Sequence, residues 1–428
     1  MNSTLYSLFL DHPVITTDSR DCPQGSIFFA LKGESFNGNA YAQSALDKGC
    51  AYAVVDEAQY ATDERCILVD DVLTTLQQLA NEHRRALKTP VIGITGTNGK
   101  TTTKELIATV LAKKYNVLYT QGNFNNHIGV PKTLLRLTKE HEIAVIEMGA
   151  NHPGEIKTLV DIVEPDYGII TNVGKAHLEG FGSFEGVIKT KGELYDKLRT
   201  KSDSKVFIDA DNKYLAGIAQ GLTLVKYGVD SDEATVKGKV IDCAPFLRYS
   251  WSTAGNNYEV QTNLIGAYNI YNMLAATTIG LHFGVTPQQV CEALSSYVPS
   301  NNRSQLTVTD NNKLIVDTYN ANPTSMAAAL NNFAIMAVEP KMAILGDMRE
   351  LGSVSAEEHQ KVVDFLQQHP DITVWLVGGE FGKTACDYRK FPDVTAVKEE
   401  IAQHPLKDKY ILIKGSNGIK LFELPALL

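Results

Sequence analysis

The chain has 428 residues, of which 44% are hydrophobic and 21% are charged, and its formal net charge is −9 at pH 7. This length predicts roughly two to four domains that each bury a core, and the acidic balance argues against general nucleic-acid binding. No apolar run of about 18 residues predicts a membrane span, and the N-terminus lacks a signal-peptide pattern. The 6 cysteines are scattered without a C-x-x-C pair, which favours a reducing cytoplasm over a disulfide framework or a zinc site.

Apolar runs of strand length alternate with helical patterns along the chain and fall into three groups. We expect one domain in each of residues 1–88, 89–300 and 301–428. A helix at 73–87 closes the first group, and hairpin-like strands lie within 228–262 of the second. This alternation indicates parallel sheets with covering helices, so the predicted fold class is α/β. The predicted strands are 27–31, 51–56, 89–95, 116–120, 143–149, 167–174, 313–317, 342–347, 373–379 and 410–416.

The stretch GITGTNGKTTTKE at 93–105 is typical of a phosphate-binding loop, although it departs from the strict Walker A spacing. The strict pattern requires its first glycine at position 94, which is Ile94 in this chain, and the nearest glycines are Gly93 and Gly96. A glycine-rich turn before a helix still brings backbone N–H groups to the helix N-terminus, where they favour an anion. Lys100 can then face the β- and γ-phosphates, and the Thr101 hydroxyl can ligate Mg²⁺. The alternative is an ordinary strand–turn–helix connection with threonine caps.

Two further residues follow strands of the second group, at the sheet edge where ligands bind in such folds. Glu147 ends the run IAVIE within the predicted strand 143–149, where a P-loop protein holds its metal-facing acid, and His177 lies in a glycine-bounded loop. Either residue can instead be structural, as a helix-capping acid or a surface histidine. Asn269 and Asn272 share one helix face, which fits either a polar ligand or buried hydrogen bonds between helices.

Lys191 lies inside an apolar helical stripe of the second group. An unpaired ammonium buried in such a stripe would be costly. A lysine at this position usually extends its amine to solvent along the apolar surface. The other possibility is chemical, because a desolvated neutral amine can react with CO₂ to give a carbamate anion that ligates Mg²⁺.

Together these motifs resemble the Mur ligase family over essentially the whole chain. The matching strings are TDSR and GSIFFALKGESFNG in the first group, TGTNGKTTTKE, QGNFNNHIGVP, EMGANHPGEI and TNVGKAHLEGFGS in the second, and NNRSQ, DTYNANPTSM, LGDMRELG and KGSNGIK in the third. TGTNGKT is shared by the wider family, including folylpolyglutamate synthases, whereas QGNFNNHIGVP and YNANPTSM resemble the member that adds D-alanyl-D-alanine. The resemblance implies an N-terminal UDP-substrate domain, a central P-loop ATPase-like domain with a parallel sheet, and a Rossmann-like C-terminal α/β domain that closes on ATP and binds the incoming dipeptide.

The resemblance implies an ATP-dependent amide ligase that joins D-alanyl-D-alanine to UDP-N-acetylmuramoyl-tripeptide through an acyl phosphate, with release of ADP and phosphate. Its product would be a peptidoglycan precursor, which places the enzyme in cell-wall biogenesis, cell shape and cell division. We expect a cytoplasmic monomer without a nucleic-acid partner. The alternatives are a ligase for a different amino acid, a nucleotide-dependent switch and an inactive scaffold. YNANPTSM argues against the first, the lack of an Asn-Lys-x-Asp base-reading motif against a GTPase switch, and the complete catalytic set against the third.

The resemblance also assigns site residues by position. The catalytic set would be Lys100, Glu147, His177 and Lys191. The ATP contacts would be Thr95, Gly96, Thr97, Asn98, Gly99, Lys100, Thr101, Thr102, Asn269, Asn272, Arg303 and Asp317. Two Mg²⁺ ions would be held by Thr101, Glu147, His177 and N6-carboxylated Lys191. One departure leaves the adenine contacts open, because this chain has Tyr268 where the family usually has histidine.

The remaining assignments concern the two substrates to be joined. The uridine end would be held by Ser19, Arg20, Asn37 and Gly38. The muramoyl-peptide portion would be lined by Asn123, Asn125, Asn126 and His127. The dipeptide side would be formed by Tyr319, Asn320, Asn322 and Pro323.

Overall fold

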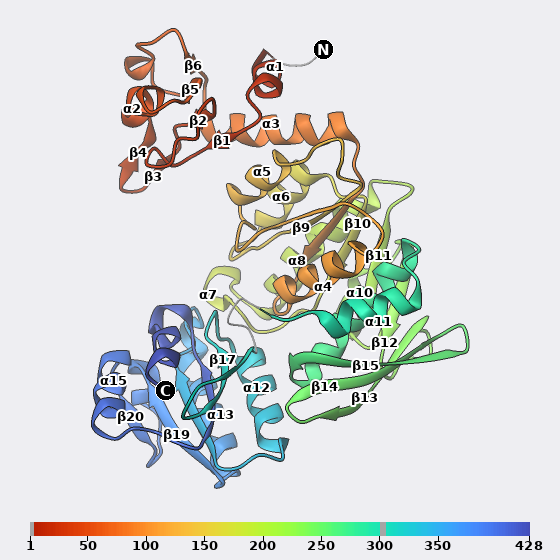
Figure 1. The fold of residues 1–428 in the computed structure, drawn as a ribbon, viewed down its shortest axis with the longest axis vertical. Coiled ribbons are helices and arrows are strands. Elements are labelled where there is room, and N and C mark those ends of the chain that lie inside the picture. The colour runs from red at the N-terminus through yellow and green to blue at the C-terminus, as the bar shows by residue number, and fades with distance from the viewer. Residues whose placement is uncertain (1–3, 300–304) are drawn as a thin grey trace.

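The computed structural model describes residues 4–299 and 305–428, and these form three α/β units built on separate sheets (Figure 1). Most strand pairs in the three sheets are parallel, which confirms the predicted α/β fold class with three domains. Domain boundaries at 88/89 and 300/301 remain a prediction. Within the described residues, none of the helices has the length and apolar character needed to cross a membrane.

The first unit is a sheet in the order β1-β2-β5-β6 with parallel pairs throughout. Each residue of its β2 strand is buried, because helices and loops cover both faces of a parallel sheet. A separate two-stranded ribbon, β3-β4, projects from it. The elements are α1 (Thr4–Asp11), β1 (Ile15–Thr16), β2 (Ile27–Phe29), β3 (Lys32–Gly33), β4 (Phe36–Asn37), α2 (Ala42–Asp47), β5 (Tyr52–Val55) and β6 (Cys66–Leu68).

Helix α3 (Val72–Leu87) connects the first unit to the second and lies along one end of the central unit (Figure 1). Its N-cap is Asp71, whose side chain accepts a hydrogen bond from the Thr74 N–H at 2.6 Å. Near its C-terminus, Arg84 is 6% exposed, and its guanidinium donates to the Val163 carbonyl at 3.0 Å. This buried attachment fixes the helix to the central unit.

The central unit contains a nine-stranded sheet in the order β15-β14-β13-β12-β11-β10-β7-β9-β8. The strands from β8 to β13 are parallel, and β13, β14 and β15 form the antiparallel extension predicted within 228–262. Its first half comprises β7 (Val91–Thr95), α4 (Lys100–Leu111), β8 (Val117–Tyr119), α5 (Gly129–Leu134), β9 (Ile143–Glu147), α6 (Glu155–Val163), β10 (Tyr167–Ile170), α7 (Leu178–Phe181) and α8 (Phe184–Arg199). Its second half comprises β11 (Lys205–Asp209), α9 (Lys213–Ile218), β12 (Leu224–Gly228), β13 (Val236–Cys243), β14 (Phe246–Thr253), β15 (Asn256–Ile265), α10 (Ile270–His282) and α11 (Pro287–Ser296).

The C-terminal unit contains a six-stranded sheet in the order β16-β17-β21-β18-β19-β20, in which only the edge pair β16-β17 is antiparallel. Separate apolar clusters cover its two faces, as expected for a parallel sheet. Its elements are β16 (Gln305–Val308), β17 (Lys313–Asp317), α12 (Pro323–Ile335), β18 (Lys341–Gly346), α13 (Ser355–Gln367), β19 (Ile372–Val377), α14 (Gly379–Gly382), β20 (Arg389–Phe391), α15 (Val394–Gln403) and β21 (Tyr410–Lys414).

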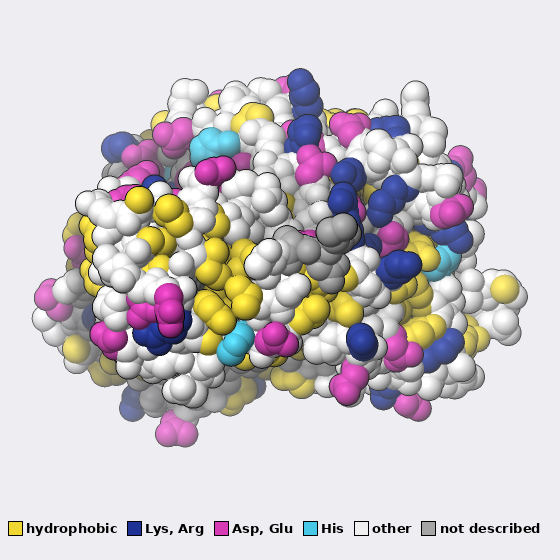
Figure 2. Space-filling view, turned by 90° about the horizontal axis from the view of Figure 1, so that it is seen from above, with side chains coloured by type: hydrophobic (Ala, Val, Ile, Leu, Met, Phe, Trp, Pro, Cys, Tyr) yellow, Lys and Arg dark blue, Asp and Glu magenta, His cyan; other side chains and the backbone are white. Residues whose placement is uncertain are grey.

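Seen from the end where the first unit lies, the surface carries acidic and basic side chains interspersed with apolar ones (Figure 2). The charge of −9 is therefore not gathered into one acidic field on this face. A small anionic ligand would depend on local donors rather than on a field over the whole surface.

Candidate active site

A cavity of about 1250 Å³ lies between the central and C-terminal units and reaches Leu73 and Gln77 of α3. Three acidic residues at strand ends line it, Glu147 of β9, Asp209 of β11 and Asp317 of β17. The carboxyl ends of parallel strands from two sheets thus meet at one space, which is where ligands bind in α/β folds.

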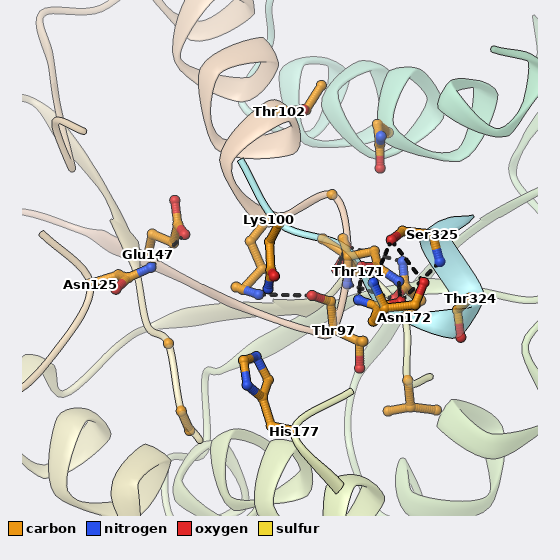
Figure 3. Close-up of a pocket in the computed structure, with 18 of the residues that line it drawn as sticks. Thr97, Lys100, Thr102, Asn125, Glu147, Thr171, Asn172, His177, Thr324 and Ser325 are labelled. Carbon is orange, nitrogen blue, oxygen red and sulfur yellow. Dashed lines mark hydrogen bonds between the residues drawn. The ribbon is translucent and has the colours of Figure 1, made fainter. Parts of the chain in front are cut away.

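The glycine-rich loop between β7 and α4 forms one wall of the cavity. Gly96 has φ +145°, and a Cβ there would lie 2.0 Å from the Thr171 hydroxyl oxygen, so the loop needs glycine at this position. The Lys100 amine donates to the carbonyls of Gly96 at 2.8 Å and Thr97 at 2.9 Å. In Figure 3 this lysine lies between Glu147 and Thr97, at the N-terminus of α4 where an anion is favoured.

Glu147 is 1% exposed and is surrounded by polar groups. The Thr101 hydroxyl donates to its carboxylate at 3.0 Å, and the Asn125 amide donates to it at 2.8 Å. The ammonium of Lys104, which is also buried, lies 3.7 Å from the same carboxylate. A carboxylate and a hydroxyl beside a phosphate-binding loop are ligands that Mg²⁺ takes together with substrate phosphates, so these residues fit the ion.

Sequence reasoning missed Lys104. Its signal was its spacing, because it lies one helical turn after Lys100 and therefore on the same side of α4. A lysine that is 0% exposed requires an acidic or polar partner. The acid that it contacts is the predicted metal-facing Glu147.

Lys191 is buried rather than extended to solvent, which removes the first of the two alternatives that the sequence left open. The residue is 2% exposed, its amine donates to the Ala150 carbonyl at 3.2 Å, and it lies 5.2 Å from the centroid of the Phe181 ring. Burial, with a smaller contribution from the Lys100 charge, lowers the pKa of the Lys191 amine to about 7. A large fraction of this amine is therefore neutral near neutral pH.

His177 lines the cavity, and in Figure 3 its ring points toward Lys100. Its backbone is left-handed, with φ +49°, and its Nδ1 is hydrogen-bonded to the Glu350 carboxylate of the C-terminal unit. Burial lowers the pKa of His177. No cluster of three or more His, Cys, Asp or Glu side chains able to hold a metal occurs within 4–299 and 305–428.

Asn269 and Asn272 make the buried hydrogen bonds that the sequence offered as one alternative, and their role toward a polar ligand stays a prediction. They line the cavity, and they are also hydrogen-bonded internally, since the Asn272 amide donates to the Asn269 side-chain oxygen at 2.7 Å and Thr103 donates to Asn272 at 3.0 Å. Tyr268 lines the same region. Sequence reasoning missed a neighbouring group of lining residues at the end of β11, in the turn after it, at the start of α9 and in α10: Asp209, Asp211, Asn212, Lys213, Tyr214 and Tyr271.

The C-terminal unit contributes two polar contacts to the cavity. Asp317 is hydrogen-bonded to the Lys414 amine, which joins the ends of adjacent strands β17 and β21. Asn322 caps α12 by accepting from the Ser325 N–H at 2.9 Å, and its amide donates to the side-chain oxygen of Asn98 in the phosphate loop at 2.8 Å. Lys414 was missed as a site residue, although it belongs to the KGSNGIK string.

The structure brings most of the predicted residues to one cavity. Those that line it are Thr97, Asn98, Gly99, Lys100, Thr102, Asn123, Asn125, Asn126, His127, Glu147, His177, Asn269, Asn272, Asp317, Tyr319, Asn320 and Asn322. Those outside its lining are Thr95, Gly96, Thr101, Lys191, Pro323, Ser19, Arg20, Asn37 and Gly38. Arg303 lies outside the described residues.

The predicted uridine-binding residues belong to the first unit, apart from the main cavity. Arg20 is exposed and pairs with Asp18 at 2.7 Å. Asn37 donates to Glu57 at 2.9 Å, and a Cβ at Gly38 would lie 2.2 Å from the Leu31 carbonyl oxygen. The described contacts of these residues are therefore structural.

The fold and the cavity define a class, a P-loop α/β protein whose third unit reaches the phosphate-binding loop. Comparison with known families narrows this class. Three family models match the chain. They are the Mur ligase family, catalytic domain, over residues 13–84, the Mur ligase middle domain over 94–280, and the Mur ligase, glutamate ligase domain, over 302–417. The chain belongs to the Mur ligase family, which confirms the resemblance drawn from its motifs.

Individual relatives match nearly the whole chain. UDP-N-acetylmuramoyl-tripeptide–D-alanyl-D-alanine ligase of Bacillus subtilis is 33% identical, with 96% of this chain and 92% of the relative covered. The enzyme of the same name from Escherichia coli is 33% identical, with 99% and 95% covered. The crystal structure of MurF from Acinetobacter baumannii has a TM-score of 0.87 at 30% identity, covering 96% and 92%. MurF ligase from Thermotoga maritima, in complex with ADP, shares the fold with a TM-score of 0.88 at 24% identity, covering 100% and 98%.

Proposed function

We propose that this chain is the ATP-dependent ligase that joins D-alanyl-D-alanine to UDP-N-acetylmuramoyl-tripeptide. The observation that carries the proposal is full-length similarity to ligases of that name, at 33% identity. The cavity supports it, because the phosphate-binding loop lies opposite polar residues of the C-terminal unit. The product would be the UDP-muramoyl-pentapeptide used for peptidoglycan, and the reaction would take place in the cytoplasm.

The reaction would have two steps. The terminal carboxylate of the tripeptide attacks the γ-phosphorus of ATP, which forms an acyl phosphate and releases ADP. The amine of D-alanyl-D-alanine then attacks the acyl carbon, loses its proton, and phosphate leaves as the amide forms. Two anions must approach each other in the first step, so Lys100 and the N–H groups at the start of α4 neutralise charge and hold the phosphates in line. Closing the cavity between the units excludes the water that would hydrolyse the acyl phosphate.

The metal ligands are part of the proposal. Thr101 and Glu147 would hold one Mg²⁺, and His177 with carbamylated Lys191 would hold the second. The ions would offset phosphate charge during transfer. Support comes from the Thr101–Glu147 contact of 3.0 Å and from the neutral amine favoured at Lys191, whose pKa lies at about 7.

The substrate assignments also stand as proposals. The first unit would hold the uridine end, through the four residues named from its TDSR and FNG strings. Asn123, Asn125, Asn126 and His127 lie on the cavity wall nearest α3, where the Gln77 amide donates to the His127 carbonyl at 3.0 Å. The muramoyl-peptide portion would therefore run from the first unit past α3 to the phosphate loop.

The test is release of ADP by the full chain with UDP-N-acetylmuramoyl-tripeptide, Mg²⁺ and ATP, with and without D-alanyl-D-alanine. We expect turnover that requires the dipeptide and yields one amide product for each ADP, as measured by mass spectrometry. A screen of other amino acids and dipeptides is the control for acceptor choice. Equal ADP release without the dipeptide, or faster turnover with a different acceptor, would contradict the proposed reaction.

A further inference from the structure

The contact between His177 and Glu350 joins two units at the edge of the cavity. His177 belongs to the loop before α7 in the central unit, and Glu350 follows β18 in the C-terminal unit. The imidazole Nδ1 is hydrogen-bonded to the Glu350 carboxylate, and the Glu179 N–H donates to the Glu350 carbonyl at 3.3 Å. Glu350 of the C-terminal unit therefore contacts both the His177 side chain and the Glu179 backbone of the central unit.

The backbone at this contact is specialised on both sides. His177 has φ +49° and Glu350 has φ +64°, values that non-glycine residues adopt rarely and that a surrounding structure must enforce. Such conformations cluster where a side chain has to be aimed. Here each one turns its side chain toward the other unit.

Glu350 is carried on a segment that is firmly attached to its own unit. The N–H of the preceding residue, Arg349, donates to the Ser416 hydroxyl at 2.9 Å, and the Met348 N–H donates to His359 Nε2 at 3.0 Å. The backbone that carries the Glu350 carboxylate is therefore attached to the C-terminal unit. Its position relative to His177 depends on how the two units are docked.

A carboxylate on one imidazole nitrogen determines what the other nitrogen can do. With the proton held at Nδ1 by Glu350, Nε2 keeps its lone pair and is available to a cation. The ring points toward Lys100 within the cavity (Figure 3). This arrangement is a carboxylate–histidine pair aimed at the place where a second metal is proposed.

We propose that Glu350 is a positioning residue, supplied by the C-terminal unit, that orients His177 for the second Mg²⁺ and so makes this metal site depend on domain docking. The inference rests on the proposed role of His177 as a ligand. Neither unit provides the oriented histidine alone, so metal affinity and closure are coupled. An open arrangement would leave the His177 ring free to rotate and the site weak.

The test titrates full-length enzyme with Mn²⁺ in the presence of a non-hydrolysable ATP analogue and the UDP-tripeptide, with binding followed by electron paramagnetic resonance. We expect Glu350→Ala to weaken the second Mn²⁺ site by about 10- to 100-fold, the range for loss of a carboxylate behind a metal-binding histidine. Glu350→Gln keeps an acceptor for Nδ1 and should recover part of the affinity. In kinetics, the concentration of Mg²⁺ required for activity should rise more than the KM for ATP.

The matched control is Glu358→Gln. Glu358 pairs with Lys175 across the same interface at 3.1 Å, so this variant removes an interdomain ion pair without touching His177. This variant should bind Mn²⁺ at the second site with an affinity within about twofold of that of the wild type. Circular dichroism and melting temperature establish that each variant is folded.

Two outcomes separate this inference from the function on which it rests. If His177→Ala weakens the second Mn²⁺ site and Glu350→Ala leaves it unchanged or tightens it, the positioning role of Glu350 is wrong. If His177→Ala itself leaves Mn²⁺ binding unchanged, the assignment of His177 as a ligand fails, and the role of Glu350 fails with it. Neither result bears on dipeptide-dependent ADP release, which tests the ligase separately.

Discussion

The chemistry available to Lys191 depends on its surroundings more than on its residue type. A lysine amine is normally protonated at neutral pH, but burial beside Phe181 and near Lys100 lowers the pKa of this one to about 7. Only the neutral amine can add CO₂, so burial is what makes a carbamate accessible. The structure thus turns a cation into a candidate anionic ligand.

Lys191→Ala should lower ligase activity by about 100-fold, and short-chain carboxylic acids should restore part of it by supplying the lost carboxylate. After CO₂ is removed from wild type, the rate at which added CO₂ restores activity should rise from about pH 6 to about pH 8, because the neutral fraction of an amine increases above its pKa. The control is Lys197→Ala. Lys197 lies on the same helix as Lys191, and its amine pairs with Asp161 of α6. Full activity of Lys191→Ala without added acids would exclude the carbamate.

The phosphate-binding loop illustrates how an element places functional groups. Its geometry requires glycine at position 96, where φ is +145° and a side chain would meet Thr171. Gly96→Ala should therefore displace the loop and weaken ADP binding by about tenfold or more, equivalent to about 1.4 kcal/mol. Isothermal titration calorimetry measures this directly. Gly217→Ala is the control, since a Cβ there has nothing within 4 Å, and unchanged affinity in both variants would show that the loop does not bind the nucleotide.

Helix α3 carries two adjacent arginines with different environments. Arg84 is 6% exposed and donates to the carbonyls of Val163 and Glu164, and to Asp166 at 2.7 Å. Arg85 forms an exposed pair with Glu164, its own side chain being 63% exposed. One arginine therefore satisfies buried acceptors, while the other is largely solvated.

Arg84→Ala should lower the stability of the unit formed by α3 and the central sheet by about 2–3 kcal/mol, because buried acceptors lose their donor. Arg85→Ala should cost less than about 1 kcal/mol, as expected for an exposed ion pair. The free energies of unfolding of the two variants can be compared by urea denaturation followed by tryptophan fluorescence, since Trp251 lies in the central unit. Equal effects of the two substitutions would contradict the buried anchoring role of Arg84.

At the scale of the whole molecule, the cavity is complete only when the central and C-terminal units meet. Asn322 shows this dependence, because it caps α12 and also contacts Asn98 of the phosphate loop at 2.8 Å. Its amide supplies a neutral contact where nucleotide phosphates are expected. A negative charge at the same position would repel them.

Asn322→Asp retains an oxygen that caps α12 but should weaken ATP binding by about tenfold, or about 1.4 kcal/mol. Fluorescence titration with a labelled ATP analogue measures the affinities of the variant and of the wild type. Asn331→Asp adds the same charge to an exposed position of the same helix and should leave affinity unchanged. If Asn322→Asp bound ATP as tightly as wild type, the C-terminal unit would not contribute to the phosphate site in this docked arrangement.

Each of the ten apolar runs predicted as strands contains a strand of the structure, because apolar runs report the burial of parallel strands on both faces. Eight strands, namely β1, β3, β4, β6, β11, β12, β16 and β20, were not predicted. The run predicted at 313–317 is β17, and the helix predicted at 73–87 is α3. Sequence reasoning also found Glu147 at the end of β9. It did not identify Lys104, Lys414 or Glu350, whose partners Glu147, Asp317 and His177 are distant in sequence.

The sequence by itself determined the α/β class, the glycine-rich loop before α4 and membership of the Mur ligase family, because periodicity and short motifs are local properties of the chain. Only the tertiary structure decided that Lys191 is buried, that Lys414 meets Asp317 and that Glu350 reaches His177. Burial and the pKa shifts that follow from it depend on every element packed around a residue. Contacts between units depend on how separately folded sheets dock, and no pattern within one segment encodes that geometry.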